Sequence, residues 1–165
     1  MHIDVRNYLT GLEAVYANDP LGFLWEFAPV HEWWHMERMQ GTQQIGFLTF
    51  HHLVIKSFGS TFPTGQIPVQ PSSIAPFPPV LGTAAGSVTD TASLREFSED
   101  LEGWHNAVHN AVGGRFLDPV RNVYQRIFWQ FHLFLDGQFE SALTAMGHTF
   151  NSYFDQVSES DQRDI

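Results

Sequence analysis

Two pairs of histidines, in each of which the members lie four residues apart, constrain the fold of this chain more than any other feature. His31 pairs with His35, and His105 pairs with His109 within the stretch WHNAVHNAVGG. On an α-helix, residues four apart are neighbours on one face. Nine histidines in 165 residues would give only about half of one such pair by chance. The spacing therefore predicts two helices that each present two imidazoles on one side.

Apolar residues at helical spacing predict five helices, and no segment has a convincing strand pattern. The expected helices cover residues 4–17, 20–40, 42–58, 93–112 and 118–136, and the last can continue past Gly137 toward Gly147. Pro29 is expected to kink or restart the second helix just before His31. The fold class is therefore expected to be all-α: an antiparallel four-helix bundle core with one extra helix, in a single domain covering residues 1–165.

The segment 59–93 is predicted to be a long irregular loop rich in proline and glycine. It contains six of the nine prolines in the chain. Long loops of this kind are usually functional covers or mobile segments, and Phe62 or Phe77 is a candidate to lie near the entrance of a pocket. The polar tail 156–165 is expected to be frayed.

The charge of the chain excludes several classes of partner. The formal net charge is −10, and Lys56 is the single lysine. Nucleic acid and anionic membrane surfaces would repel such a chain, so neither is expected as a partner. The N-terminus lacks the basic start and continuous apolar core of a signal peptide, so a cytoplasmic location is expected unless a partner or a trimmed leader exports the protein. No pattern indicates an oligomeric state.

Each histidine pair is followed by a further histidine on the next predicted helix, which suggests two metal sites. His132 follows the second pair, whereas either His51 or His52 can follow the first, because both share a helix face with apolar residues. Three imidazoles leave a metal ion with open positions, as in reactive sites. Imidazole suits zinc, copper, iron and nickel, but the absence of cysteine and of carboxylates at the third positions favours copper.

Two phrases in the second half of the chain resemble the second copper motif of type 3 copper proteins, the family of tyrosinases, catechol oxidases and hemocyanins. LEGWHNAVHNAVGG at 101–114 is similar to the family's Leu-Glu, H-N-x-x-H and Gly-Gly, and IFWQFHLFLD at 127–136 is similar to I-F-W-x-H-H-x-x-x-D. His132 matches the ligand histidine of that phrase. FLTFHH at 47–52 is similar to the family's F-L-P-W-H-R, and this match selects His51 over His52. The chain is unusually short for the family, and Asp118-Pro119 lies several residues before the IFW phrase instead of next to it.

The resemblance implies two copper ions with dioxygen as co-substrate. One copper ion would be held by His31, His35 and His51, and the other by His105, His109 and His132. The pair would bind dioxygen as peroxide, hydroxylate a small monophenol at the ortho position and/or oxidise a catechol to its quinone. The resemblance also implies catalytic roles for Asn106, directly after His105, and for Glu102, which would hold the water that accepts the phenolic proton.

Other interpretations of the same residues remain open. Glu32 and Glu102 each precede a histidine by three positions, as in the E-x-x-H motifs of ferritin-like di-iron carboxylate bundles, and Glu13, Glu26 or Glu140 would have to complete that site. A dicopper site could instead bind oxygen reversibly, as in hemocyanins. The histidines could also be structural, and Glu102 could be a solvated helix residue.

Overall fold

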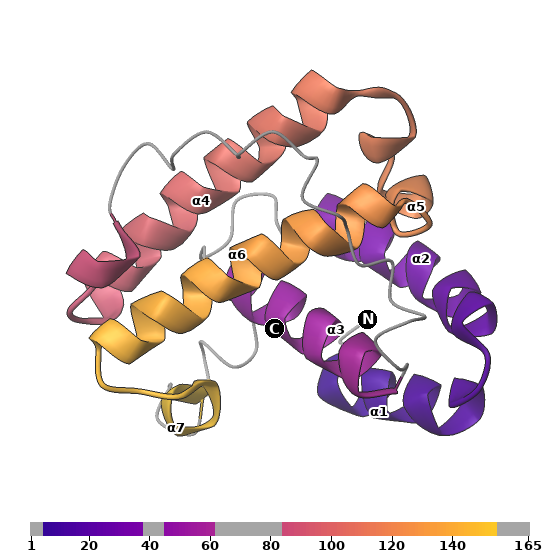
Figure 1. Ribbon diagram of the computed structural model, residues 1–165, viewed down its shortest axis with the longest axis horizontal. Coiled ribbons are helices and arrows are strands. Elements are labelled where there is room, and N and C mark those ends of the chain that lie inside the picture. The colour runs from indigo at the N-terminus through magenta and orange to yellow at the C-terminus, as the bar shows by residue number, and fades with distance from the viewer. Residues whose placement is uncertain (1–4, 38–44, 62–83, 155–165) are drawn as a thin grey trace.

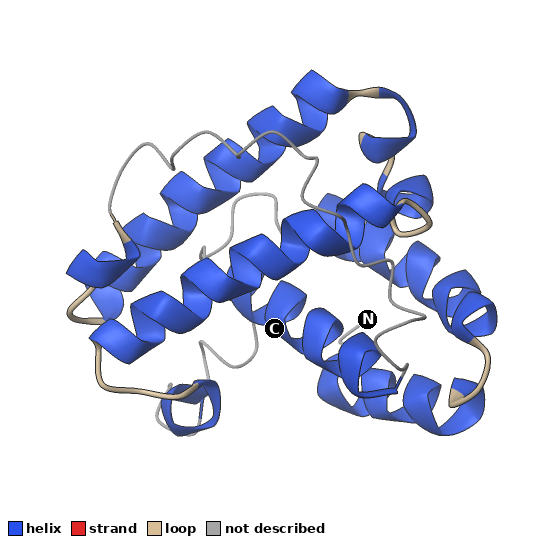
Figure 2. Cartoon of the chain, in the orientation of Figure 1, coloured by secondary structure: helices blue, strands red, loops and turns tan. Residues whose placement is uncertain are grey.

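The computed structural model describes residues 5–37, 45–61 and 84–154, and these residues form helices and connecting turns without any strand (Figure 2). The all-α prediction is confirmed. Most of the predicted loop, including Phe62 and Phe77, and the predicted polar tail lie outside the described residues. The elements are α1 (Val5–Tyr16), α2 (Pro20–Glu37), α3 (Ile45–Thr61), η1 (Ala85–Ser87), α4 (Thr91–Val112), η2 (Gly114–Phe116), α5 (Pro119–Asn122), α6 (Arg126–Ala145) and α7 (Phe150–Phe154).

Helix α2 passes through Pro29 without the predicted restart. Proline removes one backbone hydrogen bond and presses its ring on the preceding turn. Pro29 and Trp25, whose carbonyl loses its partner, both lie on the exposed side of the helix. Water can satisfy that carbonyl, so the helix continues and keeps His31 and His35 on one face.

The predicted helix 118–136 is divided in two. Asp118 caps α5 by accepting a hydrogen bond from the backbone nitrogen of Val120 at 3.0 Å, and Pro119 occupies the first position of that helix. The chain then turns through 123–125 before α6 begins. The indole of Trp129 donates to the carbonyl oxygen of Val123 at 2.8 Å, which holds the turn against the new helix. Helix α6 continues through Gly137 as the sequence allowed.

Helix α4 is fixed at both ends. Asp90 and Ser93 form a reciprocal capping box at its start, so the helix begins two residues earlier than predicted. At its end, Gly113 and Gly114 take φ values of 64° and 58°, a conformation that favours glycine. The chain therefore leaves α4 immediately after the turn that holds His109 and enters η2.

The long helices share one aromatic core. Helix α3 packs against α1, α4 and α6, while α2 packs against α1 and α5; Figure 1 shows α4 and α6 alongside one another. The largest fully buried side chains are two tryptophans, eight phenylalanines and Leu94. The antiparallel four-helix bundle itself remains a prediction. None of the described helices combines the length and apolar character needed to cross a bilayer.

Candidate metal centre

The six histidines predicted as ligands lie in one cluster within the aromatic core. They come from four helices: His31 and His35 from α2, His51 from α3, His105 and His109 from α4, and His132 from α6. All are buried except His35, which is partly exposed. Buried polar side chains require partners, so the cluster needs a chemical explanation.

The first predicted set is brought together directly. His31, His35 and His51 each offer one ring nitrogen, and these three atoms lie within 4.8 Å of one another. The Nε2 atoms of His31 and His35 are 3.0 Å apart. These three side chains could bind a single metal ion without a change of helix positions.

The second set is arranged differently from the prediction. The ring nitrogens within 4.8 Å of one another belong to His51, His105 and His132. His109 lies beside them, with its ring centroid 4.3 Å from that of His105 and 5.7 Å from that of His132. Its Nε2 is buried and has no hydrogen-bond partner. His51 thus belongs to both groups, and His109 is adjacent to the second.

Backbone carbonyls fix the protonation of four of these rings. A carbonyl oxygen can only accept a hydrogen bond, so an Nδ1 atom that contacts one must carry the proton. The Nε2 atom of each such ring then keeps its lone pair, which is the form that binds a metal. The four pairs are His31 with Pro119 at 2.8 Å, His51 with Phe47 at 2.7 Å, His109 with Phe116 at 2.6 Å and His132 with Phe128 at 2.7 Å.

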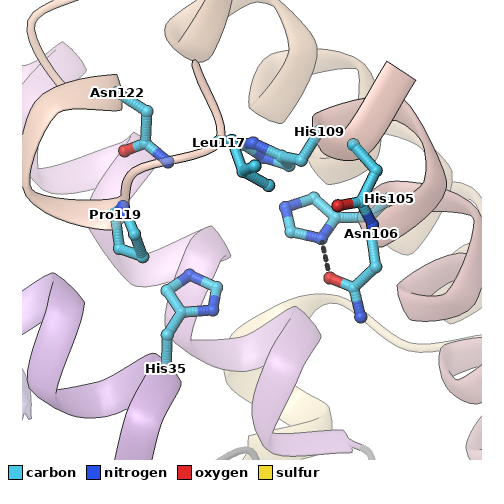
Figure 3. Close-up of a pocket in the computed structure, with 8 residues that line it drawn as sticks. His35, His105, Asn106, His109, Leu117, Pro119 and Asn122 are labelled. Atoms are coloured by element: carbon cyan, nitrogen blue, oxygen red, sulfur yellow. Dashed lines mark hydrogen bonds between the residues drawn. The ribbon is translucent and has the colours of Figure 1, made fainter. Parts of the chain in front are cut away.

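A fifth ring, that of His105, also presents an unprotonated Nε2 to the cluster. His105 donates from Nδ1 to Oδ1 of Asn106 at 3.0 Å (Figure 3), so its Nε2 also carries a lone pair. That atom lies 3.1 Å from Nε2 of His132. Two facing lone pairs repel unless a cation lies against them. The Nε2 atoms of His51 and His109 are buried without any hydrogen-bond partner. This donor set fits metal ions that prefer imidazole.

Burial keeps all six imidazoles neutral. It is the largest cause in each case, and it lowers the pKa of His31 to about 4 and that of His51 to about 3. Burial, followed by the neighbouring imidazoles, holds the pKa values of His35, His105 and His132 well below the ordinary value, and burial also lowers the pKa of His109. Neutral imidazole is the ligand form, so no deprotonation has to precede metal binding near neutral pH.

A pocket of about 310 Å³ opens onto the cluster. Figure 3 shows its lining, which includes histidines of both groups: His35 from the first, and His105 with its neighbour His109 from the second. The remaining lining residues are neutral: Asn106, Asn110, Leu117, Pro119 and Asn122. A small molecule in this pocket would contact both groups at once.

The two predicted catalytic residues occupy different environments. Asn106 lines the pocket and contacts His105. Glu102 is half-buried one turn earlier on α4 and does not line the pocket. Burial, and secondarily the charge of Glu99, raises the pKa of Glu102 to about 7. The structure therefore brings Asn106 to the site and leaves Glu102 beside it.

His52 lies in a separate polar network. Its Nδ1 is 2.6 Å from Oδ1 of Asp136, and its ring stacks on Phe150. Lys56 contacts Asp136 at 3.2 Å and Glu140 at 2.7 Å. His52, Asp136 and Glu140 lie close enough to hold a cation, but the ammonium of Lys56 already lies against both carboxylates. Of the two histidines left open by periodicity, His51 is the one in the cluster.

Carboxylates do not join the histidine cluster in the described part of the chain. Glu26 and Glu32 are exposed, and Glu140 pairs with Lys56. Both ligand groups in the cluster consist of histidines alone. A di-iron site of the ferritin-like kind needs four carboxylates, so the geometry favours the histidine-only site.

Comparison with protein-family models, with curated proteins and with solved structures gives no match. The functional assignment therefore rests on the sequence motifs and on the geometry of the six histidines.

Proposed function

We propose that this chain is a tyrosinase-like dicopper oxidase, which uses dioxygen to hydroxylate small monophenols at the ortho position and/or to oxidise catechols to quinones. The observation that carries the proposal is the convergence of six neutral imidazoles in one cluster within the aromatic core, five of which present an unprotonated Nε2. Imidazole ligands without thiolate or carboxylate suit copper, as do the motifs around His105 and His132. Two copper ions, when bound, would supply the redox chemistry with dioxygen.

Each copper ion would take three histidines. We assign His31, His35 and His51 to one ion and His105, His109 and His132 to the other. His51 has a single free nitrogen and can serve only one ion, and the first group has no other third histidine. The unpartnered Nε2 of His109 supports its assignment to the second ion.

The protein's own residues would hold the ligands and exclude water. Backbone carbonyls fix the Nδ1 protons, and aromatic rings pack on the imidazoles: Phe116 lies 4.1 Å from His109 and Phe128 lies 4.0 Å from His132 between ring centroids. Asn106 would hold His105 in orientation at the edge of the pocket. Glu102, with its raised pKa, would orient a water that accepts the phenolic proton.

Metal content and oxidation activity test this proposal together. Apoprotein loaded with copper is expected to bind two ions per chain, to gain near-ultraviolet absorption that depends on dioxygen, and to oxidise a catechol. Zinc-loaded protein is the control, because zinc has no redox chemistry, and it should be inactive. Dioxygen-dependent absorption without catechol oxidation would indicate a reversible oxygen carrier instead. Failure to bind copper would contradict the proposal.

The neutral pocket predicts a preference among catechols. The residues that line it carry no charge, and the chain has a net charge of −10. Burial of a carboxylate without a partner is costly, so kcat/KM for 4-methylcatechol should exceed that for 3,4-dihydroxybenzoate by about tenfold or more. Measurement at low and high salt separates two causes: a preference due to burial persists, whereas one due to net charge shrinks. Equal kcat/KM values would contradict this account of the pocket.

A further inference from the structure

The segment from Gly114 to Asn122, which contains η2 and α5, holds one histidine of each predicted copper set. The carbonyl oxygen of Phe116 accepts from Nδ1 of His109 at 2.6 Å. The carbonyl oxygen of Pro119 accepts from Nδ1 of His31 at 2.8 Å, across 88 residues of sequence. The two contacts join α4 and α2 through one short stretch of backbone.

Other histidines of the cluster are held locally. His51 bonds to Phe47, and His132 bonds to Phe128, in each case a carbonyl four residues earlier on the same helix. Those orientations follow from the helix itself. The orientations of His31 and His109 depend instead on where residues 114–122 lie.

Two polar side chains hold this segment in shape. The side chain of Asp118 caps α5 by accepting from the backbone nitrogen of Val120 at 3.0 Å, next to the backbone hydrogen bonds that the Asp118 main-chain carbonyl accepts from Arg121 and Asn122. Asn122 is 3% exposed, and its Nδ2 lies 3.5 Å from the same Phe116 oxygen that accepts from His109. A carbonyl oxygen has two lone pairs and can accept from both.

We infer that residues 114–122 act as a clamp that orients His31 and His109 together, with Asp118 and Asn122 as positioning residues, so that the two metal sites are coupled through one segment. The coupling of two metals rests on the proposed function, whereas the orientation of the two imidazoles does not. Loss of a partner that orients a metal-binding histidine typically lowers metal affinity by about 10- to 100-fold. Disturbance of the clamp should therefore weaken both sites.

The test compares Asp118→Ala with two variants. Asp118→Asn keeps a side chain that caps a helix equally well and should restore the clamp. Asp90→Ala is the matched control, because it removes the corresponding cap of α4. The side chain of Asp90 contacts Ser93 and not the α5 segment. NMR of the apoprotein measures how fast imidazole protons exchange with solvent. In Asp118→Ala, the Nδ1 protons of His31 and His109 should exchange at least about tenfold faster than in the wild-type protein. Those of His51 and His132 should be unchanged.

Copper titration against a competing chelator provides the second measurement. Asp118→Ala should weaken the binding of both ions by about tenfold or more, and neither Asp118→Asn nor Asp90→Ala should do so. Equal effects of Asp118→Ala and Asp90→Ala, or faster exchange at only one of the two histidines, would overturn the clamp. If the NMR result holds and the wild-type protein binds no copper, the clamp stands and the dicopper function fails. If copper binds and exchange is unaltered, the function stands and the clamp fails.

Discussion

His51→Ala and His109→Ala are each expected to lower copper content from two ions to about one per chain and to abolish dioxygen-dependent catechol oxidation. Each variant removes one of three ligands from a different ion in the proposed assignment. His51 supplies a buried free Nε2 to the first set, and His109 is the remaining unpartnered imidazole beside the second. Activity should fall to background in both variants, because the reaction needs both metals. Metal analysis and the catechol assay measure the two effects.

His52→Ala is the matched control for His51→Ala. His52 is adjacent in sequence and similarly buried, but it contacts Asp136 instead of the cluster. The loss of His52 should reduce stability and leave two copper ions bound.

An electron paramagnetic resonance signal from one isolated copper(II) ion should appear in His51→Ala and in His109→Ala. Retention of two ions and full activity in His109→Ala would show that His51 serves the second ion, and the proposed ligand set would then be wrong.

Helical spacing accounts for what the sequence could predict about the site. Residues four apart on a helix must share a face, so each histidine pair could be placed without knowledge of the fold. The third histidine of each set could be predicted on the next helix, because helices adjacent in sequence usually pack together. The choice between His51 and His52 could not be made from periodicity, since both faces of α3 are apolar. It depends on Asp136, which is 84 residues away and bonds to His52.

Sequence patterns could not predict the clamp formed by residues 114–122. Asp118-Pro119 signals the start of a helix, but nothing local shows that the helix ends at Asn122 and that a new one begins at Arg126. That break brings the carbonyls of Phe116 and Pro119 onto His109 and His31. Backbone acceptors carry no sequence signature, because every residue has a carbonyl group. The sequence also could not show that His51 belongs to both groups, because that depends on how the four helices pack together.

Acidification from pH 7 to pH 5 is expected to destabilise the apoprotein. Burial lowers the pKa of six histidines from the ordinary value of 6.5, to about 4 for His31 and about 3 for His51. Below pH 6.5 the unfolded chain takes up protons at these positions and the folded chain does not. The histidines therefore leave the free energy of unfolding unaffected well above pH 6.5 and lower it as the pH decreases below that value.

The size of this effect exceeds that of an ordinary surface substitution. Each histidine that stays neutral in the folded chain lowers the free energy of unfolding by about 1.4 kcal/mol per pH unit, over the range between its unfolded and its folded pKa. Glu102 acts in the opposite direction, because its raised pKa of about 7 makes the folded chain hold a proton that the unfolded chain releases above its ordinary value of 4.5. His31 and His51 alone, with folded-state pKa values of about 4 and about 3, outweigh Glu102, and the other four histidines act in the same direction, so unfolding takes up protons and stability falls as the pH decreases below 6.5.

Denaturant unfolding followed by circular dichroism at several pH values measures this dependence. His109→Gln should lower the proton uptake on unfolding, because burial lowers the pKa of His109 in the folded chain. Copper-loaded protein should unfold at lower pH than the apoprotein, because bound metal occupies the nitrogens that protons would take. A free energy of unfolding that stays constant from pH 7 to pH 5 would mean that the imidazoles are solvated in the apoprotein. The buried array of neutral imidazoles would then be incorrect, and with it the structural basis of both proposed metal sites.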